Sequence, residues 1–331
     1  MEEKALLRVE NLHVTFEPKA RAVRGVSLEI REREVHGLVG ESGSGKTVTS
    51  SAVMGILPEP PARINMGKII FKGKNILELE EEEKRSIRGK EIAMVFQEPA
   101  KYLNPAFKIG EQIGEMLRLH LGMSRSEALE RTLEILGLVG LGADKRILNS
   151  YPHELSGGMK QRAMIAMAIS CNPSLVIADE PTTALDVTLQ RQILKLIEKL
   201  KESLNMSILF ISHDLGIVRE IANKISVIYA GKIVENAGKE ELFEKPLHPY
   251  TKLLLLSIPD PEKRGRRLKS IPGKVPDASS VPSGCAFHPR CPIAEDICSA
   301  EEPPLVPVKA GENVRGLHLV ACHFTGKKWI E

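Results

Sequence analysis

Residues 40–47 of this 331-residue chain read Gly-Glu-Ser-Gly-Ser-Gly-Lys-Thr, a pattern that can hold the phosphates of a nucleotide. The run follows an apolar stretch typical of a strand and precedes a stretch that suits a helix. Its glycines let successive backbone N–H groups turn toward a phosphate, Lys46 adds a positive charge, and the Thr47 hydroxyl suits Mg²⁺. The predicted phosphate-binding residues are Gly40, Ser42, Gly43, Ser44, Gly45, Lys46 and Thr47.

Two neighbouring acids, Asp179 and Glu180, follow the apolar run 175–178. A carboxylate at the end of such a strand can reach a metal ion held by Thr47, and a second one can polarise the water that attacks a γ-phosphate. Exposed acids close many strands without any function. The apolar strand before this pair and Pro181 after it favour a catalytic role.

A second candidate anion site lies at residues 155–162, which read Leu-Ser-Gly-Gly-Met-Lys-Gln-Arg and open a helix-compatible run. Free N–H groups and the positive end of the helix dipole make a helix start of this kind suitable for a phosphate. One chain does not need two sites for one γ-phosphate. We therefore expect Ser156, Gly157 and Gly158 to complete the nucleotide pocket of a partner subunit.

The rest of the first 240 residues predicts an α/β fold. Apolar residues alternate with polar ones in 12–16 and 26–30, as in half-buried strands, whereas the continuous apolar runs 175–178 and 208–211 suit central strands buried on both faces. Helical spacing of apolar residues in 189–200 lies between these two strands. A further helical stretch at about 110–141 predicts an insertion.

Together these motifs resemble the ATPase subunits of ABC transporters, over about residues 5 to 240. The same resemblance identifies Gln97 as the Q-loop glutamine, Ala184-Leu185-Asp186 as the D-loop and His213 as the switch histidine. It implies a P-loop ABC ATPase core with a mixed sheet, an antiparallel β subdomain and a helical insertion at about 98–165.

Residue roles follow from the resemblance. ATP and Mg²⁺ are the implied ligands, with Thr47, Gln97 and Asp179 at the metal ion. Glu180 is the implied base, His213 contacts the γ-phosphate, and Gln97 links the site to the membrane partner. Ser156, Gly158 and Asp186 act across a dimer interface. Phe16 resembles the aromatic residue that stacks on adenine, although it could equally be a core residue.

Composition changes after about residue 240, where Pro becomes frequent and four of the five Cys are found. This segment, 241–331, is predicted as a small second domain that needs a staple other than a hydrophobic core. It resembles the C-terminal extension of oligopeptide/dipeptide and nickel importer ATPases. The four cysteines, spaced C-x5-C-x6-C-x23-C, are Cys285, Cys291, Cys298 and Cys322.

In dipeptide-type members this spacing holds a 4Fe-4S cluster. Four thiolates can saturate either a cluster or a zinc ion, but C-x2-C pairs common in structural zinc sites are lacking here. We favour the cluster over zinc, empty thiols or disulfides. His288 and His323 are alternative ligands that we expect to face solvent.

Charge and hydropathy limit the location and partners. With 46 Lys and Arg against 43 Asp and Glu the net charge is +3, which argues against nucleic acid as a partner. The acidic start lacks the basic region of a signal peptide, and no apolar run approaches the roughly 20 residues that span a bilayer. We expect a peripheral protein at the cytoplasmic face of the cell membrane.

The resemblance implies an ATPase that energises uptake of di- or oligopeptides. The implied partners are a second, related ATPase subunit (in a heterodimer, or as a homodimer in isolation), two membrane permease subunits and an extracytoplasmic substrate-binding protein. Residues 98–109 are expected to dock on the permease, although Ala100-Lys101-Tyr102 stands where Met-Thr-Ser is usual. Nickel or an oligosaccharide is the alternative cargo. A non-transport ABC ATPase is disfavoured, because such proteins usually carry two cassettes or a long coiled coil.

Overall fold

The computed structural model describes residues 5–183, 185–258, 271–308 and 317–325. The chain divides into two units. The first comprises Met1–Leu6, Arg31–Glu34 and Ile76–Ile211, and the second comprises Leu7–Ile30, Val35–Asn75 and Ser212–Glu331. Among the helices formed by the described residues, none has the length and hydrophobicity needed to cross a bilayer.

Parallel strands form the centre of the first unit. β7 (Leu175–Asp179) pairs on one side with β6 (Ile92–Val95) and on the other with β8 (Ser207–Ser212). Every residue of the three strands is buried, as expected for strands covered on both faces. The loops that follow β6 and β7 leave the sheet at the same edge because the two strands are parallel.

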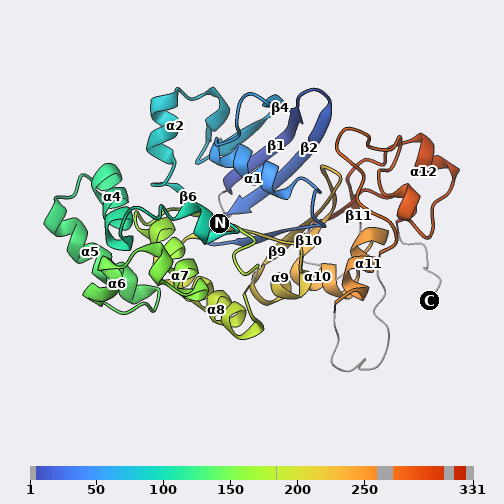
Figure 1. The fold of residues 1–331 in the computed structure, drawn as a ribbon. Helices are drawn as coiled ribbons and strands as arrows, with labels where there is room; N and C mark the ends of the chain where they lie inside the picture. Colours follow the sequence, from blue (N-terminus) through green and yellow to red (C-terminus); the bar gives the residue numbers. More distant parts are fainter. Residues whose placement is uncertain (1–4, 184, 259–270, 309–316, 326–331) are drawn as a thin grey trace. The chain divides into compact units, whose positions relative to one another are not determined.

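Helices make up most of the remaining first unit. In chain order they are η1 (Ile76–Glu78), α2 (Glu81–Ile87), α3 (Pro99–Tyr102), α4 (Ile109–Leu121), α5 (Arg125–Leu138), α6 (Lys145–Asn149), η2 (Pro152–Glu154), α7 (Gly157–Ile169) and α8 (Val187–Leu204). Helix α4 packs against α5, α6 and α7, and Figure 1 shows this group in green. The stretch 110–141, predicted as helical, contains α5 and nearly all of α4.

An antiparallel sheet forms one part of the second unit, in the order β2-β1-β4-β5. The strands are β1 (Ala5–Phe16), β2 (Ala20–Arg31), β4 (Ala62–Phe71) and β5 (Lys74–Asn75). Strand β1 pairs with β4 from Leu7 opposite Phe71 to Phe16 opposite Ala62. This sheet is the antiparallel subdomain that the sequence predicts.

A mixed sheet forms the other part of the second unit. β3 (Val35–Val39) runs parallel to β9 (Lys224–Tyr229), which pairs antiparallel with β10 (Lys232–Gly238). Two short strands of the C-terminal extension complete it, since β12 (His318–Val320) pairs with β10 and β11 (Val306–Val308) pairs with β12. The helices of this unit are α1 (Lys46–Met54), α9 (Leu215–Ile221), α10 (Lys239–Glu244), α11 (Pro249–Leu256), η4 (His288–Arg290) and α12 (Asp296–Ala300).

A buried acid fastens the extension to β10. The Glu235 side chain is fully buried, and its carboxylate accepts hydrogen bonds from His318 Nε2 at 2.7 Å and from the backbone N–H groups of Leu247 and His248 at 2.7 and 3.0 Å. A buried charge is tolerated only where such partners satisfy it. The Pro-rich extension is therefore joined to the cassette by a polar network as well as by strand pairing.

Candidate functional site

The predicted phosphate loop connects β3 to α1 in the second unit. Gly45 caps α1 with φ of 104°, a left-handed conformation that favours glycine. A Cβ atom at Gly40 would lie 2.2 Å from the carbonyl oxygen of Ile228, so that position has no room for a side chain. The sequence thus places glycines where the backbone must turn tightly against the end of β9.

The lysine of the loop is held by the loop itself. Lys46 Nζ donates hydrogen bonds to the carbonyl oxygens of Gly40 at 2.7 Å and Glu41 at 3.0 Å, and only 5% of the residue is exposed. Ser42, Gly43 and Thr47 are exposed. The start of the nine-residue helix α1, an ammonium group and an open hydroxyl together form an anion site with a ligand for Mg²⁺.

The structure brings two predicted catalytic residues together in the first unit. Gln97 follows β6, Glu180 follows β7, and Gln97 Nε2 donates a hydrogen bond to Glu180 Oε2 at 3.1 Å. The hydroxyl of Thr183 donates to the same oxygen at 3.0 Å. Asp179, the last residue of β7, is 4% exposed. Glu180 has φ of 45°, uncommon outside glycine, and such backbone strain is often found at functional sites.

The second predicted anion site is the exposed start of α7, also in the first unit. Ser156 caps this 13-residue helix, and its hydroxyl accepts a hydrogen bond from the N–H of Met159 at 3.4 Å. A Cβ atom at Gly157 would meet nothing within 4 Å, whereas one at Gly158 would touch Leu189 of α8 at 3.3 Å. The helix start is thus capped, free of side chains at Gly157, and open to a ligand from outside.

Three other predicted residues have clear positions. Asp186 caps α8, and its carboxylate accepts hydrogen bonds from the N–H groups of Thr188 and Leu189, both at 3.0 Å. His213 is exposed directly after β8. Phe16 is half-buried at the end of β1. Ala184 of the predicted D-loop lies outside the described residues.

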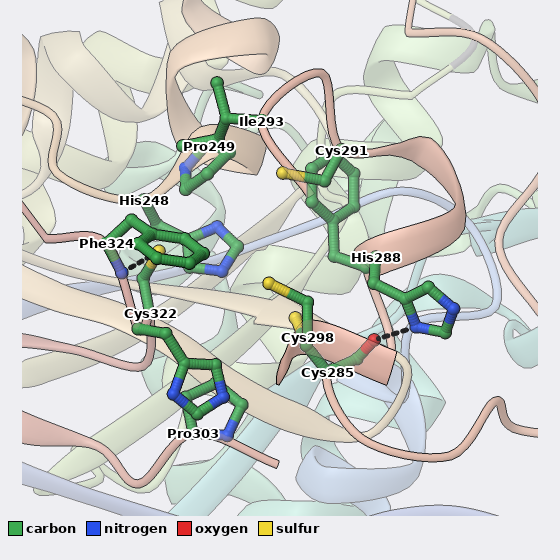
Figure 2. Close-up of a pocket in the computed structure, with 12 residues that line it drawn as sticks. His248, Pro249, Cys285, His288, Cys291, Ile293, Cys298, Pro303, Cys322 and Phe324 are labelled. Carbon is green, nitrogen blue, oxygen red and sulfur yellow. Dashed lines mark hydrogen bonds between the residues drawn. The ribbon is translucent and has the colours of Figure 1, made fainter. Parts of the chain in front are cut away.

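The four cysteines of the extension line one pocket, together with His248, Phe324 and other residues (Figure 2). Cys285 and Cys298 are neighbours, because the N–H of Cys285 donates a hydrogen bond to the carbonyl oxygen of Cys298 at 2.8 Å. Burial raises the pKa of the Cys285 and Cys291 thiols to about 11 and also raises the pKa of Cys322. In the described part of the chain, no three His, Cys, Asp or Glu side chains are grouped to hold a metal ion.

A groove of about 860 Å³ lies along α4 and α5 in the first unit, beside the segment 98–109. Phe107 and Leu129 line it and are 52% and 45% exposed. Gln112 of α4 shapes its edge, donating hydrogen bonds to the carbonyl oxygens of Asn104 at 3.1 Å and Phe107 at 2.9 Å. No sequence motif includes Gln112.

Another contact missed from the sequence joins the phosphate loop to the extension. The Glu41 carboxylate forms two hydrogen bonds with the guanidinium of Arg290, at 2.7 and 2.9 Å, and the N–H of Glu41 donates to the hydroxyl of Tyr250 at 2.9 Å. Both partners lie in the segment 241–331, which resembles the C-terminal extension of importer ATPases. Nothing in the sequence of that segment indicates that it reaches residue 41.

Comparison with known proteins decides the family. A probable peptide ABC transporter ATP-binding protein of Sinorhizobium fredii, y4tR, is 48% identical over 322 residues, covering 96% of this chain and 94% of the relative. The chain belongs to the ABC transporter ATP-binding proteins. Residues 23–183 match the ABC transporter family, and residues 234–298 match the family described as oligopeptide/dipeptide transporter, C-terminal region. The second match ends at Cys298 and leaves Cys322 outside.

Two further relatives of this ABC transporter ATP-binding protein extend over nearly the whole chain. The oligopeptide transport ATP-binding protein AppD of Bacillus subtilis is 48% identical and covers 94% of this chain and 95% of its own length. The dipeptide transport ATP-binding protein DppD of Escherichia coli is 45% identical and covers 97% of each chain.

Solved ABC cassettes share the fold of this ABC transporter ATP-binding protein. The dimeric cassette MJ0796 bound to ADP and Pi has a TM-score of 0.63 and 28% identity, covering 70% of this chain and 98% of the cassette. The structure of cbiO1 from Clostridium perfringens has a TM-score of 0.64 and 25% identity, covering 73% and 92%. The predicted P-loop ABC ATPase fold is therefore confirmed.

Proposed function

We propose that the chain is the ATP-hydrolysing subunit of an importer of di- or oligopeptides and that it works in a dimer of cassettes. The observation that carries the dimer is the open, serine-capped start of α7, an anion site additional to the phosphate loop. Relatives named as dipeptide and oligopeptide transport proteins support the peptide cargo over nickel or an oligosaccharide.

By the roles that the family resemblance implies, Lys46 and His213 would contact the γ-phosphate, and Thr47 and Asp179, together with Gln97, would hold Mg²⁺. Water attacks the γ-phosphorus, its proton passes to Glu180, and the bond to the β-phosphate oxygen breaks to give ADP and phosphate. Support for Glu180 comes from its two hydrogen bonds, which fix the carboxylate at the end of β7. Phe16 is the proposed stacking partner of adenine.

The opposite cassette supplies Ser156, Gly157 and Gly158 to the γ-phosphate, and Asp186 faces the interface. A phosphate at the start of α7 would gain from free N–H groups and from the helix dipole. ATP contacts that exist only in the closed dimer would favour closure, and loss of the γ-phosphate would let the pair reopen. We propose a related but non-identical cassette as the partner, with a homodimer in isolation.

The segment 98–109 and the groove along α4 and α5 form the proposed docking face for one of the two membrane permease subunits of the complex. The ring of Tyr102 stacks on that of Phe96 with centroids 3.8 Å apart and planes 9° apart. Because Phe96 precedes Gln97, this stack joins the docking segment to the catalytic glutamine. A peripheral position at the cytoplasmic membrane face and an extracytoplasmic substrate-binding protein complete the proposal.

The cysteine pocket is the proposed site of a 4Fe-4S cluster. The donor set fits, since four thiols line one pocket. A single zinc ion needs its four sulfurs about 2.3 Å from one point, whereas a cluster takes one thiolate at each of several irons. A cluster bound there would cross-link and stabilise the Pro-rich extension. The four cysteine thiols would have to lose their protons to bind it.

Two experiments test the proposed function. The Glu180→Gln variant, mixed with Mg-ATP, should sediment as a dimer and without nucleotide as a monomer. Coexpression with the permease subunits of the proposed transporter should yield a membrane complex whose ATPase activity rises when a peptide-loaded binding protein is added. A permanent monomer with full ATPase activity would contradict the dimer, and failure to bind any permease would contradict the transport role.

A further inference from the structure

A partly buried ion pair joins the phosphate loop to the C-terminal extension within the second unit. The two terminal nitrogens of the Arg290 guanidinium donate to the two carboxylate oxygens of Glu41, Nη1 to Oε2 at 2.7 Å and Nη2 to Oε1 at 2.9 Å. The Arg290 side chain is only 5% exposed and that of Glu41 is 30% exposed. Two parallel charge-assisted hydrogen bonds of this kind are strong and directional.

The guanidinium is anchored independently of Glu41. Its Nε donates to the carbonyl oxygen of Pro272 at 2.7 Å, and the group lies over the ring of Tyr229 at 5.7 Å from the centroid. Arg290 also ends η4, a short turn closed by its own backbone hydrogen bond to Phe287 at 3.0 Å. Because several contacts fix Arg290, it can set the position of Glu41.

A second residue of the extension holds the backbone at the same point. The hydroxyl of Tyr250 accepts the N–H of Glu41 at 2.9 Å. Tyr250 is fully buried, with its ring edge-on to Tyr229 at 4.7 Å and tilted against Phe287 at 5.3 Å. Residues after 240 thus fix both the amide and the carboxylate of Glu41.

Glu41 in turn holds the residues that meet phosphate. Its carbonyl oxygen accepts hydrogen bonds from Lys46 Nζ at 3.0 Å and from the N–H of Ser44 at 3.2 Å. A shift of Glu41 would therefore move the ammonium and the turn that face the triphosphate. Without its cation, the Glu41 carboxylate would also place a negative charge beside an anion site.

We propose that Arg290 is a positioning residue for ATP binding, which holds the phosphate loop through Glu41 and cancels the charge of that carboxylate beside the triphosphate. A loop that is already held in its binding conformation before ATP arrives loses less conformational freedom on binding, and its affinity for ATP is therefore higher. The role concerns binding rather than the chemical step, since Arg290 does not touch the reacting atoms. The proposal rests on residues 40–47 as the site of the ATP phosphates.

The test compares Kd for Mg-ATP, KM and kcat in full-length variants. Arg290→Ala should raise Kd and KM about tenfold, equivalent to about 1.4 kcal/mol, with kcat within about twofold. Adding Glu41→Gln to Arg290→Ala should recover part of the affinity, because the unpaired carboxylate is removed. The single variant Glu41→Gln is measured beside them. Wild-type affinity in folded Arg290→Ala would overturn the proposal. So would a double variant whose Kd rises by the product of the fold-changes seen in the two single variants, because the two residues would then act independently.

Two further variants guard against loss of folding. Glu302→Gln removes other ion pairs of the extension, with Arg24 at 3.0 Å and Lys232 at 2.6 Å, and does not touch Glu41. Its KM should stay within about twofold of wild type. A rise in KM equal to that of Arg290→Ala would mean that any weakening of the extension lowers the affinity for ATP, and it would overturn the proposal.

Arg290→Lys keeps the charge without the two-point contact and should give a Kd between those of wild type and Arg290→Ala. If Arg290→Ala does not fold, a wild-type Kd in Arg290→Lys overturns the proposal.

The Lys46→Ala variant distinguishes a failure of the proposed role of Arg290 from a failure of the assumption that residues 40–47 bind the ATP phosphates. Loss of Mg-ATP binding in Lys46→Ala beside an unchanged Kd in folded Arg290→Ala would overturn only the role of Arg290. Undiminished Mg-ATP binding in Lys46→Ala would overturn the phosphate loop and the role of Arg290 together.

Discussion

The side-chain amide of Gln97 donates a hydrogen bond to the carboxylate of Glu180, 83 residues further along the chain, at 3.1 Å. The contact follows from the sheet, since β6 and β7 are parallel neighbours and their carboxyl ends meet at one edge. It gives the proposed base a defined orientation and connects it to the segment proposed to meet the permease.

The first prediction concerns Glu180→Gln. The variant keeps the shape of the side chain but cannot accept a proton from water, so kcat should fall about 10²- to 10⁴-fold while Kd for Mg-ATP changes little. Steady-state ATPase assays and equilibrium titration measure the two quantities. Glu202→Gln, on the exposed face of α8, is the matched control and should hydrolyse ATP normally. Undiminished turnover in Glu180→Gln would remove this residue from the role of base.

The second prediction separates two roles of Ser156. Aspartate caps helices as well as serine does, so Ser156→Asp should leave thermal stability nearly unchanged. A carboxylate there would repel the γ-phosphate of the opposite cassette, and ATPase activity should fall at least about 100-fold. Ser156→Ala, which loses the cap, should cost about 1 kcal/mol of stability. Full activity in Ser156→Asp would limit the residue to capping.

The third prediction concerns the stacked pair Phe96 and Tyr102. Tyr102→Phe keeps the aromatic stack and should copurify with the permease subunits as wild type does. Tyr102→Ala loses the stack, worth about 0.5 to 1.5 kcal/mol beyond area burial, and should recover several-fold less complex. Pull-down from detergent extracts, with thermal melting to confirm the fold, provides the measurement. Equal recovery of both variants would place the docking contact elsewhere.

The fourth prediction concerns the cysteine pocket. Protein purified without oxygen should be brown and contain iron and sulfide, and Cys291→Ser should lose both. Elemental analysis and visible absorption distinguish the outcomes. The matched control is Cys171→Ser, because Cys171 is a buried cysteine of the first unit, outside the pocket. A colourless preparation with stoichiometric zinc would refute the cluster.

The sequence was sufficient to predict those elements whose structure depends on interactions between residues close together in the chain. Continuous apolar runs predicted β7 and β8, and Ser-Gly-Gly before an apolar stretch predicted the start of α7 at Gly157, because capping and burial act over a few residues. The position of the phosphate loop between β3 and α1, and that of the two acids at the end of β7, followed in the same way.

Contacts between distant residues could not be predicted. Arg290 and Glu41 are separated by 249 positions, and neither periodicity nor spacing reports which surface charges meet after folding. The role of Gln112 in shaping the groove along α4 and α5 was missed for a similar reason, since an amide on a helix surface is ordinarily a solvated side chain. The boundary at residue 240, drawn from composition, stays a prediction.

The contacts of Tyr250 and Arg290 with Glu41 determine which truncated form of this protein is suitable for studies of nucleotide binding. A shortened chain ending near residue 240 would retain every motif proposed to contact nucleotide but would lack the side chains that bind the N–H and the carboxylate of Glu41. We therefore expect a fragment trimmed to the cassette for crystallisation or inhibitor screening to bind nucleotide more weakly, so that nucleotide affinities should be determined on the untruncated chain.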